Sequence, residues 1–550
     1  MAHDATPPDP AAVAASPATP IRDPHGTFPL RVAAVDVGSN ALRYKVAEFE
    51  SKTNCTQLAS GRAPVRLGHA AFLTGSLSAD AMDRAVEALA GFARVFDDMG
   101  VGLVKGVATS AVRETRNGPG FAQRVREETG IDLYPISGTE EARLVWTAVR
   151  SRVQLGDAKW MLVDLGGGSV EVSLADRNGL MWTESHTMGS VRLLEELSGA
   201  SDPPARFAGL LADYASTLRI PHASRHWTPV GLIATGGNIE DLARLAGQPR
   251  APGLPHYKLS REQLRGAIAR LSGMTTRQRV TKLGMREDRA DVVLPAAIVY
   301  DRVAELAGAE EVIVPFLGVQ DGLLVDAVEE ACEGDDLGRE ERTALEGALS
   351  LGRRYLFDEA HGRHVATLAL SLFDQLAGVH GLAAADRRLL LAGAVLHDIG
   401  LHVSHRKHHK HSRYLIQNSE ISGVSISELP IVALLARYHR RAAPRPSHYL
   451  YRDLDGATRT RVRRLAAILR VADSLDREHL QRVISVRVRQ VAGGLELHLE
   501  KTGRTLLEEW ALRRKGGLFA SEFGQEPVVA RPEKPAAEDT AGLAAAGQAR

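Results

Sequence analysis

One segment of the chain combines an apolar run, a glycine turn and an alternation of apolar and polar residues. The apolar run Trp160–Val163 leads to Asp164, and apolar positions alternate with polar ones from Val170 to Leu174. This pattern predicts a β-hairpin with a sharp bend. The turn between the strands consists of Gly166, Gly167, Gly168 and Ser169. Because three glycines remove every Cβ atom from the bend, its N–H groups can close on an anion such as phosphate.

A second segment near the N-terminus has the same pattern. The apolar run Val32–Val35 leads to Asp36, and a second alternation runs from Leu42 to Val46. The turn residues are Gly38, Ser39 and Asn40. A pattern that recurs after more than a hundred residues predicts a duplicated subdomain.

A third glycine turn, at Gly236 and Gly237, follows the apolar residues 231–233 and precedes a helical pattern. Two Asp-Gly hairpins followed by a Thr-Gly-Gly turn resemble the phosphate clamp of the actin, Hsp70 and sugar-kinase superfamily. Asp164, at the end of its strand, is well placed to hold a metal through water.

Two adjacent glutamates mark the start of a helix between the hairpins. Ser137 and Glu140 have the spacing of a capping box, which gives Glu140 a structural role. Glu141 is not needed for the cap, and a carboxylate beside a phosphate site has a raised pKa and is a plausible base for water. Further upstream, Arg113 follows a predicted strand and is either a surface charge or a phosphate ligand.

The overall composition excludes few classes of function. The chain has 550 residues, enough for three or four domains, and a net charge of +1, which gives no general argument for nucleic acid or membrane partners. The chain has only two cysteines, Cys55 and Cys332, far apart in the sequence. We therefore expect no disulfide framework and a protein of the reducing cytoplasm. We find no apolar run long enough for a membrane span. The Pro/Ala-rich residues 1–29 and the last residues, 530–550, are expected to be disordered tails.

The second half of the chain has helical periodicity and many histidines. His361, the pair His397-Asp398 and Asp473 resemble the metal-ligand set of HD-type phosphohydrolases. Imidazole and carboxylate ligands together suit a divalent metal, so these four residues are candidate ligands of a second divalent metal.

A run rich in histidine, lysine and arginine follows this pair. By default such a run is a solvated face, but it is also a positive patch that could attract a polyanion. We expect it to continue a phosphate track from the hairpins, through His405, Arg406, His409, His411 and Arg440. Its histidines would then strengthen binding at mildly acidic pH.

Six motifs in order extend the resemblance to one family. They are VDVGSN, ATSAVRETRN, ISGTEEARLVW, VDLGGGSVEV, MGSVRL and ATGGNIEDL. The chain resembles the exopolyphosphatase / guanosine pentaphosphate phosphohydrolase family over about residues 30–480. One departure is Gln320-Asp321, where the family commonly has Arg-Glu, and we attach no functional consequence to it.

The resemblance implies a hydrolase that releases terminal phosphate from a phosphoanhydride, with Mg²⁺ as its cofactor. The family's general base corresponds to Glu141, and Arg113 would bind phosphate oxygens. Asp164 and Glu171 would lie near the metal or the attacking water, although Glu171 could instead only stabilise its strand. The glycine turns, with Asp36, would bind the substrate. A homodimer is expected from the resemblance alone.

The predicted fold class is α/β. We expect two actin-like (ribonuclease H-like) subdomains at residues 30–145 and 146–330, an all-α HD-type domain at 340–482 and a small C-terminal α+β domain at 483–529. The sequence leaves inorganic polyphosphate and guanosine pentaphosphate open as substrates. An actin-like ATP-dependent kinase or switch is a less favoured alternative, because no acceptor-base motif is present.

Overall fold

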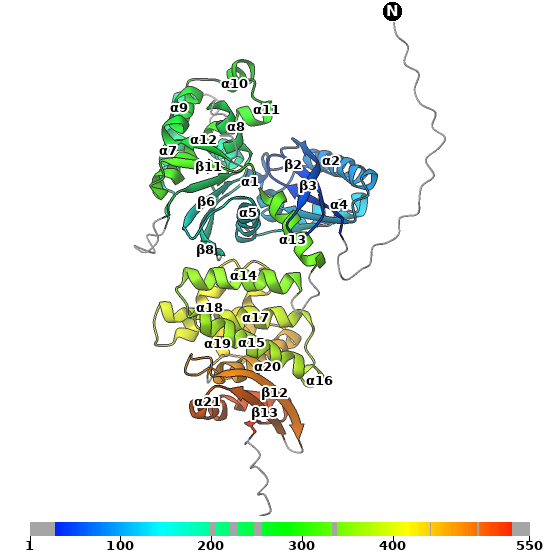
Figure 1. Ribbon diagram of the computed structural model, residues 1–550, viewed down its shortest axis with the longest axis vertical. Coiled ribbons are helices and arrows are strands. Elements are labelled where there is room, and N and C mark those ends of the chain that lie inside the picture. Colours follow the sequence, from blue (N-terminus) through cyan, green and yellow to red (C-terminus); the bar gives the residue numbers. More distant parts are fainter. Residues whose placement is uncertain are drawn as a thin grey trace, which may run out of the picture.

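The computed structural model describes residues 28–177, 179–197, 204–220, 229–246, 256–332, 338–440, 442–491 and 494–530. The predicted tails lie outside these residues, except for residues 28, 29 and 530. Two α/β lobes lie side by side at one end of an elongated molecule, and a helical region and a small sheet follow towards the other end (Figure 1). Among the described helices, we find no segment with the length and hydrophobicity that a membrane span requires.

The first lobe is built on a five-stranded sheet with the order β3-β2-β1-β4-β5. Its strands are β1 (Leu30–Val37), β2 (Leu42–Phe49), β3 (Cys55–Ala63), β4 (Leu103–Ala108) and β5 (Leu133–Pro135). Strands β1 to β3 form an antiparallel meander, and β4 pairs with β1 in parallel. The helices of this lobe are α1 (Ala71–Thr74), α2 (Ala79–Asp98), α3 (Ser110–Arg113), α4 (Gly118–Thr129) and α5 (Gly138–Arg152).

The second lobe repeats this plan on a six-stranded sheet with the order β10-β11-β9-β6-β7-β8. Its strands are β6 (Trp160–Leu165), β7 (Val170–Asp176), β8 (Gly179–His186), β9 (Leu232–Thr235), β10 (Tyr257–Ser260) and β11 (Glu311–Val314). The helices that follow along the chain are α6 (Ser190–Leu197), α7 (Pro204–Ser216), α8 (Gly237–Leu245), α9 (Arg261–Ser272), α10 (Thr276–Leu283), α11 (Glu287–Ala290), α12 (Val293–Ala307) and α13 (Val319–Cys332). Helix α13 returns to pack on β1, β2 and β4 of the first sheet, whereas α5 packs on β6, β7 and β8 of the second.

The two predicted hairpins occupy equivalent places in the two sheets. In each lobe the first hairpin strand pairs with its partner antiparallel and with a later strand in parallel. Asp36 lies opposite Arg43 in the first ladder, and Asp164 lies opposite Glu171 in the second. The duplicated hairpin pattern therefore has a structural counterpart, with one aspartate near the end of each central strand.

Helices α5 and α13 join the lobes. They pack against each other, and their apolar residues share one buried core with strands of both sheets. Helix α5 runs through residues 145 and 146, where the sequence suggested a division between subdomains. Gly322 of α13 lies so close to α5 that a Cβ atom there would be 1.8 Å from the backbone oxygen of Leu144. This contact fixes the start of α5, where Glu141 lies.

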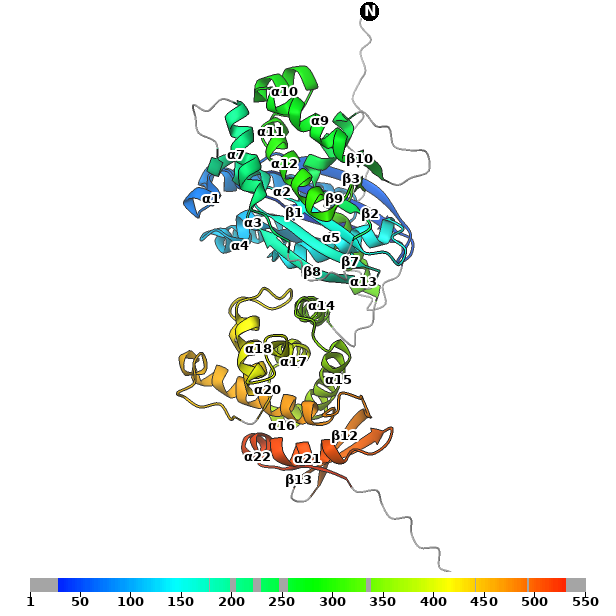
Figure 2. The same ribbon diagram turned by 90° about the vertical axis from the view of Figure 1, so that its left-hand side faces the viewer.

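The helical region consists of α14 (Arg339–Arg354), α15 (Glu359–Gln375), α16 (Ala377–His380), α17 (Ala385–Leu396), η1 (Ile399–His402), α18 (His408–Gln417), α19 (Leu429–Tyr438), η2 (Tyr451–Asp453) and α20 (Gly456–Ser474). Helix α14 packs against β8 and α5 of the lobes, as the second view also indicates (Figure 2).

The last described residues form β12 (Val483–Val491), β13 (Gly494–Lys501), α21 (Leu506–Lys515), α22 (Gly517–Phe523) and β14 (Pro527–Val529). Their buried apolar residues belong to the same core as those of the helical region. The small sheet is therefore packed onto the helices through a continuous apolar interface.

We predict that Gly322→Ala lowers the thermal unfolding midpoint of the lobes, because the new methyl group would overlap backbone atoms of α5. Overpacking of this kind costs about 1–3 kcal/mol. Gly120→Ala is the matched control, because a Cβ atom at this helical position meets no atom within 4 Å. Calorimetry of both variants tests the prediction, and equal midpoints would contradict it.

Candidate functional site

The three glycine turns meet at one cleft between the lobes. A cavity of about 610 Å³ is lined by Asp36, Asp164 and Glu141 together. The predicted phosphate-binding residues on its wall are Gly38, Ser39, Asn40, Gly166, Gly167, Gly236 and Gly237. The fold thus brings the repeated aspartates and the glutamate of α5 to one place.

The glycines of the second hairpin allow the two turns to touch. A Cβ atom at Gly167 would lie 2.9 Å from Cβ of Ser39, and one at Gly168 would lie 2.3 Å from Oγ of Ser110. Gly168 therefore packs behind the cavity and is not among the residues that line it. Ser169 is buried and donates a hydrogen bond that lowers the pKa of Glu171.

Three buried carboxylates lie together at the bottom of the site, and two of them, Glu141 and Asp164, line its cavity. Glu141, Asp164 and Glu171 each offer one oxygen, and these oxygens lie within 4.8 Å of one another. Within the described part of the chain, Oε2 of Glu141 and Oε2 of Glu171 are buried without a hydrogen-bond partner. Such a concentration of negative charge away from water requires protons or a cation.

Burial is the main reason that these groups hold protons. It raises the pKa of Glu171 to about 7, and the charge of Asp164 adds to this effect. It raises the pKa of Asp36 to about 6. Burial also raises the pKa of Asp164, and it raises that of Glu141 well above its ordinary value, with further contributions from Glu171 and Asp164. The raised pKa that the sequence predicted for Glu141 therefore has its expected direction.

Neighbouring hydroxyl groups hold two of the carboxylates in place. Oγ1 of Thr235 donates to Oδ1 of Asp164 at 2.6 Å, and Oγ of Ser185 donates to Oε1 of Glu171 at 2.7 Å. Glu171 does not itself line the cavity, so it acts on the site from behind Asp164 and Glu141.

The capping box predicted at the start of α5 is only half present. The backbone N–H of Glu140 donates to Oγ of Ser137 at 3.2 Å, but the Glu140 carboxylate accepts hydrogen bonds from Arg143 at 2.8 and 2.9 Å. Arg143 also donates to Asp326 of α13. The ion pair replaces the local bond because a buried guanidinium offers two charge-assisted hydrogen bonds. Glu141 remains outside the cap, as expected.

Arg113 lies beside the site and is not among the residues that line its cavity. Its Nη1 donates to the carbonyl oxygen of Ile136 at 2.7 Å and lies 4.0 Å from Oε2 of Glu141. Its positive charge lowers the pKa of Glu141, against the larger effect of burial.

The sequence reasoning missed the basic wall of the cleft. The cationic residues that line the cavity are Arg43, Lys45, Arg62, Arg244, Arg286 and Arg289. Asn40 also bridges the lobes, because its Nδ2 donates to the backbone oxygen of Asp288 at 2.9 Å. Arg43 and Lys45 alternate on β2 directly after the first turn, which is a signal that could have identified them.

The structure does not bring the predicted basic cluster to this cleft. His405 and Arg406 precede α18 of the helical region, and His409 and His411 lie in its first residues. None of the four lines the cleft cavity. Arg440 lines a different cavity in that region. Burial lowers the pKa of His409 to about 4, so this histidine does not gain charge at mildly acidic pH as expected.

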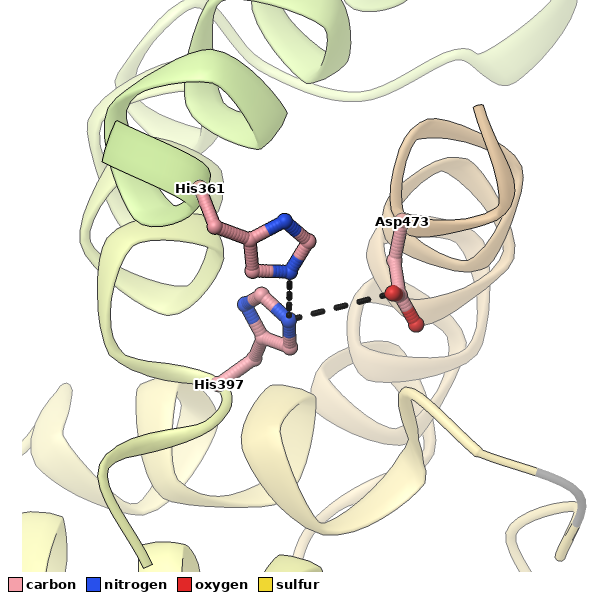
Figure 3. Close-up of side chains that lie close together, drawn as sticks. All are labelled: His361, His397 and Asp473. Atoms are coloured by element: carbon pink, nitrogen blue, oxygen red, sulfur yellow. Dashed lines mark hydrogen bonds and ion pairs between the residues drawn. The ribbon is translucent and has the colours of Figure 1, made fainter. Parts of the chain in front are cut away.

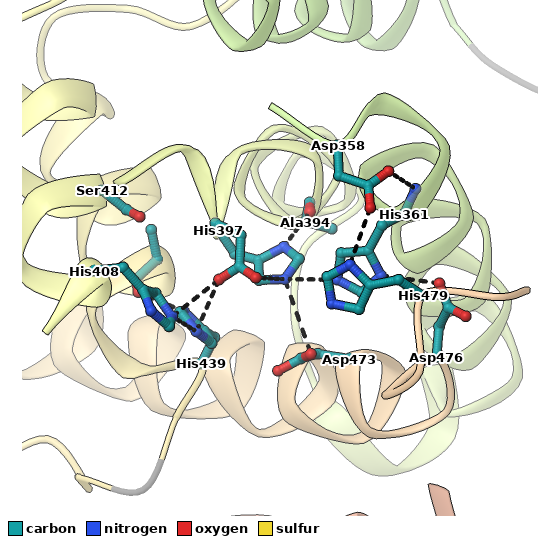
Figure 4. A network of polar contacts seen from close by, with 12 residues as sticks. Asp358, His361, Ala394, His397, His408, Ser412, His439, Asp473, Asp476 and His479 are labelled. Atoms are coloured by element: carbon teal, nitrogen blue, oxygen red, sulfur yellow. Dashed lines mark hydrogen bonds and ion pairs between the residues drawn. The ribbon is translucent and has the colours of Figure 1, made fainter. Parts of the chain in front are cut away.

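The four predicted ligands of the helical region do lie together. Nε2 of His397 lies 3.2 Å from Nε2 of His361, 3.7 Å from Oδ2 of Asp398 and 3.9 Å from Oδ1 of Asp473. Figure 3 shows His361, His397 and Asp473 converging from three separate segments. Nδ1 of His361 lies 2.9 Å from a carboxylate oxygen of Asp476 (Figure 4). Since that Nδ1–H donates to an acceptor, Nε2 of His361 presents its lone pair to the cluster.

Comparison with known proteins relates the whole arrangement to one family. The Ppx/GppA phosphatase family matches residues 46–331, and Ppx/GppA phosphatase domain III matches residues 344–516. Exopolyphosphatase 1 of Mycobacterium tuberculosis is 28% identical over 313 residues, which cover 56% of this chain and 91% of that protein. A guanosine-5'-triphosphate,3'-diphosphate pyrophosphatase of Vibrio parahaemolyticus is 26% identical over 451 residues, covering 81% of this chain and 87% of its own.

A solved structure supports the same relationship. The crystal structure of an exopolyphosphatase from Cytophaga hutchinsonii is 26% identical, has a TM-score of 0.51, and covers 54% of this chain and 98% of its own. The predicted α/β fold class is confirmed by this likeness and by the two lobes described above.

We predict that Glu171→Gln stabilises the protein at pH 8 in the presence of a chelator, and has little effect at pH 5. Because burial raises the pKa of Glu171 from 4.5 to about 7, the folded state binds more protons than the unfolded chain in this window. Stability is therefore lost as the pH rises from about 4.5 to 7, by about 1–3 kcal/mol. The glutamine side chain does not ionise in this pH range, so the variant avoids this loss of stability.

Thermal unfolding midpoints of the wild type and the variant at both pH values test this prediction. Mg²⁺ should raise the midpoint of the wild type more at pH 8 than at pH 5, because it binds the ionised carboxylates. An equal effect of the substitution at both pH values would contradict the prediction.

Proposed function

We propose that this chain, which belongs to the Ppx/GppA phosphatase family, hydrolyses the terminal phosphoanhydride bond of inorganic polyphosphate and releases orthophosphate. One observation carries the proposal: buried carboxylates with raised pKa values lie at the bottom of a cleft that is lined by three glycine turns and by basic side chains. The name of the mycobacterial relative supports the same substrate.

The charges of the cleft suit a polyanion rather than a single phosphate. Five arginines and one lysine line the cavity, and its volume of about 610 Å³ has room for several phosphoryl units. Arg43 and Arg289 approach the third turn most closely, because a Cβ atom at Gly237 would lie 2.6 and 2.1 Å from their guanidinium nitrogens. Guanidinium groups bind phosphate oxygens in pairs.

The carboxylates fit Mg²⁺. A hard cation prefers oxygen ligands, and Asp164 and Glu171 would hold it. When bound, the metal would neutralise charge on the phosphoryl oxygens.

The residues of the chain supply the rest of the reaction. The glycine turns hold the terminal phosphoryl group in line with a water molecule, and the arginines of the wall bind the phosphoryl units that follow it. The Glu141 carboxylate accepts a proton from this water as its oxygen bonds to phosphorus and the P–O bond to the chain breaks. The products are orthophosphate and a chain shorter by one unit. Positioning and charge neutralisation dominate such phosphoryl transfers.

Guanosine pentaphosphate is the alternative substrate of the same site, since its 5' end carries the same terminal group and the Vibrio relative is named for it. A kinase or switch would instead form ADP from ATP in the presence of an acceptor.

We further propose a cytoplasmic homodimer, and an HD-type helical region in which His361, His397, Asp398 and Asp473 hold a second divalent metal.

We predict that Glu141→Gln lowers phosphate release from polyphosphate by about 10²–10⁴-fold, because the base is lost. Glu140→Gln is the matched control. It removes an ion pair with Arg143 and should lower the unfolding midpoint while keeping activity within a few-fold. Phosphate release from polyphosphate, guanosine pentaphosphate and ATP, measured in parallel, identifies the substrate.

The double variant His397→Ala/Asp398→Ala should keep phosphate release from polyphosphate. If it abolishes release while Glu141→Gln retains it, the proposed catalytic site lies in the wrong domain.

We predict that Arg43→Ala raises KM for polyphosphate about tenfold with little change in kcat, because the lost contact serves binding along the chain. The apparent affinity of the wild type should fall with salt, and that of the variant should fall less steeply. Arg94→Ala, an exposed position on α2, is the control. If the KM of Arg43→Ala equals that of the wild type, the proposal that the basic wall binds the substrate is wrong.

A further inference from the structure

The start of α13 forms part of the cleft wall and has no role in the reaction described above. Residues 316–320, which follow β11 and include the first two residues of α13, all line the cavity. Phe316 has a φ of 59°, a left-handed conformation that is costly for a bulky residue and is retained mainly at functional sites. The chain therefore makes a strained turn just where α13 begins at the cavity.

This helix end offers hydrogen-bond donors that no protein group uses. Within the described part of the chain, the backbone N–H groups of Val319 and Gln320 have no hydrogen-bond acceptor. The N–H group of Gly318 donates to Oδ2 of Asp321 at 2.9 Å, so the end is only partly capped. The free N–H groups of a 14-residue helix point outward along its axis, and they favour an anion.

The side chain of Gln320 gives a second, independent indication of a ligand. It lines the cavity but is only 7% exposed. Its Nε2 is buried without a hydrogen-bond partner among the described residues, and a donor left unpaired in this way costs free energy. A phosphoryl oxygen at this place would accept from Nε2 and from the two backbone N–H groups. All three donors are neutral.

An ion pair fixes a lysine beside these donors. Nζ of Lys45 lies 2.7 Å from each carboxylate oxygen of Asp321. Lys45 comes from β2 of the first lobe and also lines the cavity. Because the carboxylate offsets the charge of the ammonium group, the wall here has several donors but little net charge. We call this group the α13 subsite; its members are Lys45, Val319, Gln320 and Asp321.

The α13 subsite lies away from the glycine turn of the first lobe. On β2, Arg43 lies opposite Asp36, whereas Lys45 lies opposite Ala34, two residues further from the turn. Each residue of a strand adds about 3.4 Å. A phosphate chain whose terminal unit lies at the glycine turns would therefore reach Arg43 first and the α13 subsite later.

We propose that the α13 subsite binds an inner phosphoryl unit of the chain, and that Gln320 determines how strongly the enzyme prefers long chains. This inference rests on the proposed function, which places the terminal unit at the glycine turns. Gln320 stands where the family commonly has arginine, so a neutral amide replaces one positive charge of the wall. An amide gives hydrogen bonds but displaces no counterion, so long chains are held less tightly and with a weaker dependence on salt.

Binding is measured by calorimetry in a Glu141→Gln background with Mg²⁺, so that chains are not consumed. The probes are long-chain sodium polyphosphate and pyrophosphate. We expect Gln320→Ala to weaken the binding of long chains about five- to tenfold, because hydrogen bonds are lost. Pyrophosphate, which ends before the α13 subsite, should bind both proteins equally.

The variant Gln320→Arg tests the role of charge in the same background. It should tighten the binding of long chains about tenfold at low salt, and should steepen the plot of log affinity against log salt by about one. Gln123→Arg is the matched control, because it adds the same charge at an exposed position of α4. It should leave affinity and salt dependence unchanged. If Gln320→Arg fails to fold, Gln320→Glu replaces it and should weaken long-chain binding more than Gln320→Ala does.

The inference is wrong if the folded Gln320 variants bind long chains as their parent does, or if pyrophosphate binding changes equally. Phosphate release from long chains, measured with Glu141 intact, separates this result from the proposed function. Release without any effect of Gln320 on binding would leave the hydrolytic function in place and remove the subsite. Altered long-chain binding without release would leave the subsite in place and remove the hydrolytic function.

Discussion

Buried negative charge at the floor of the cleft is the constraint on which the rest of the structure depends. Glu141, Asp164 and Glu171 lie close together with two oxygens unpartnered among the described residues, an arrangement that is costly unless positive charge compensates it. The arginines that line the cleft from both lobes supply positive charge near this group. In the proposed function, Mg²⁺ would supply the rest, and a phosphate chain would bind only while metal and arginines are both present.

The lobes keep this geometry because α5 and α13 form a rigid link between them. Gly322 allows the two helices to touch backbone to backbone, and the Glu140–Arg143–Asp326 ion pairs join the same helices beside the site. Glu140 thus helps to hold the helix that presents Glu141, the proposed base. Neighbouring residues of one type can have different roles because a helix turns by about 100° per residue.

Local patterns could predict the hairpins, the glycine turns and the separation of Glu140 from Glu141. Each of these depends on residues within a few positions of one another. Arg143, the partner of Glu140, follows three residues later on the same helix. Its second carboxylate partner, Asp326 of α13, could not be predicted, because it approaches only in the folded chain. The basic wall was missed for the same reason: Arg62 comes from β3 and Arg289 from α11, on opposite lobes.

The two clusters differ in ligand chemistry, and this difference separates their metals. The cleft offers only carboxylate oxygens, which favour a hard cation such as Mg²⁺. The helical region offers imidazole nitrogens whose lone pairs are fixed by hydrogen bonds from Nδ1 to backbone oxygens or to Asp476, a set that favours transition metals. In the proposed assignment the cleft would therefore hold Mg²⁺ and the helical cluster a transition metal, each selected by the type of its ligand atoms.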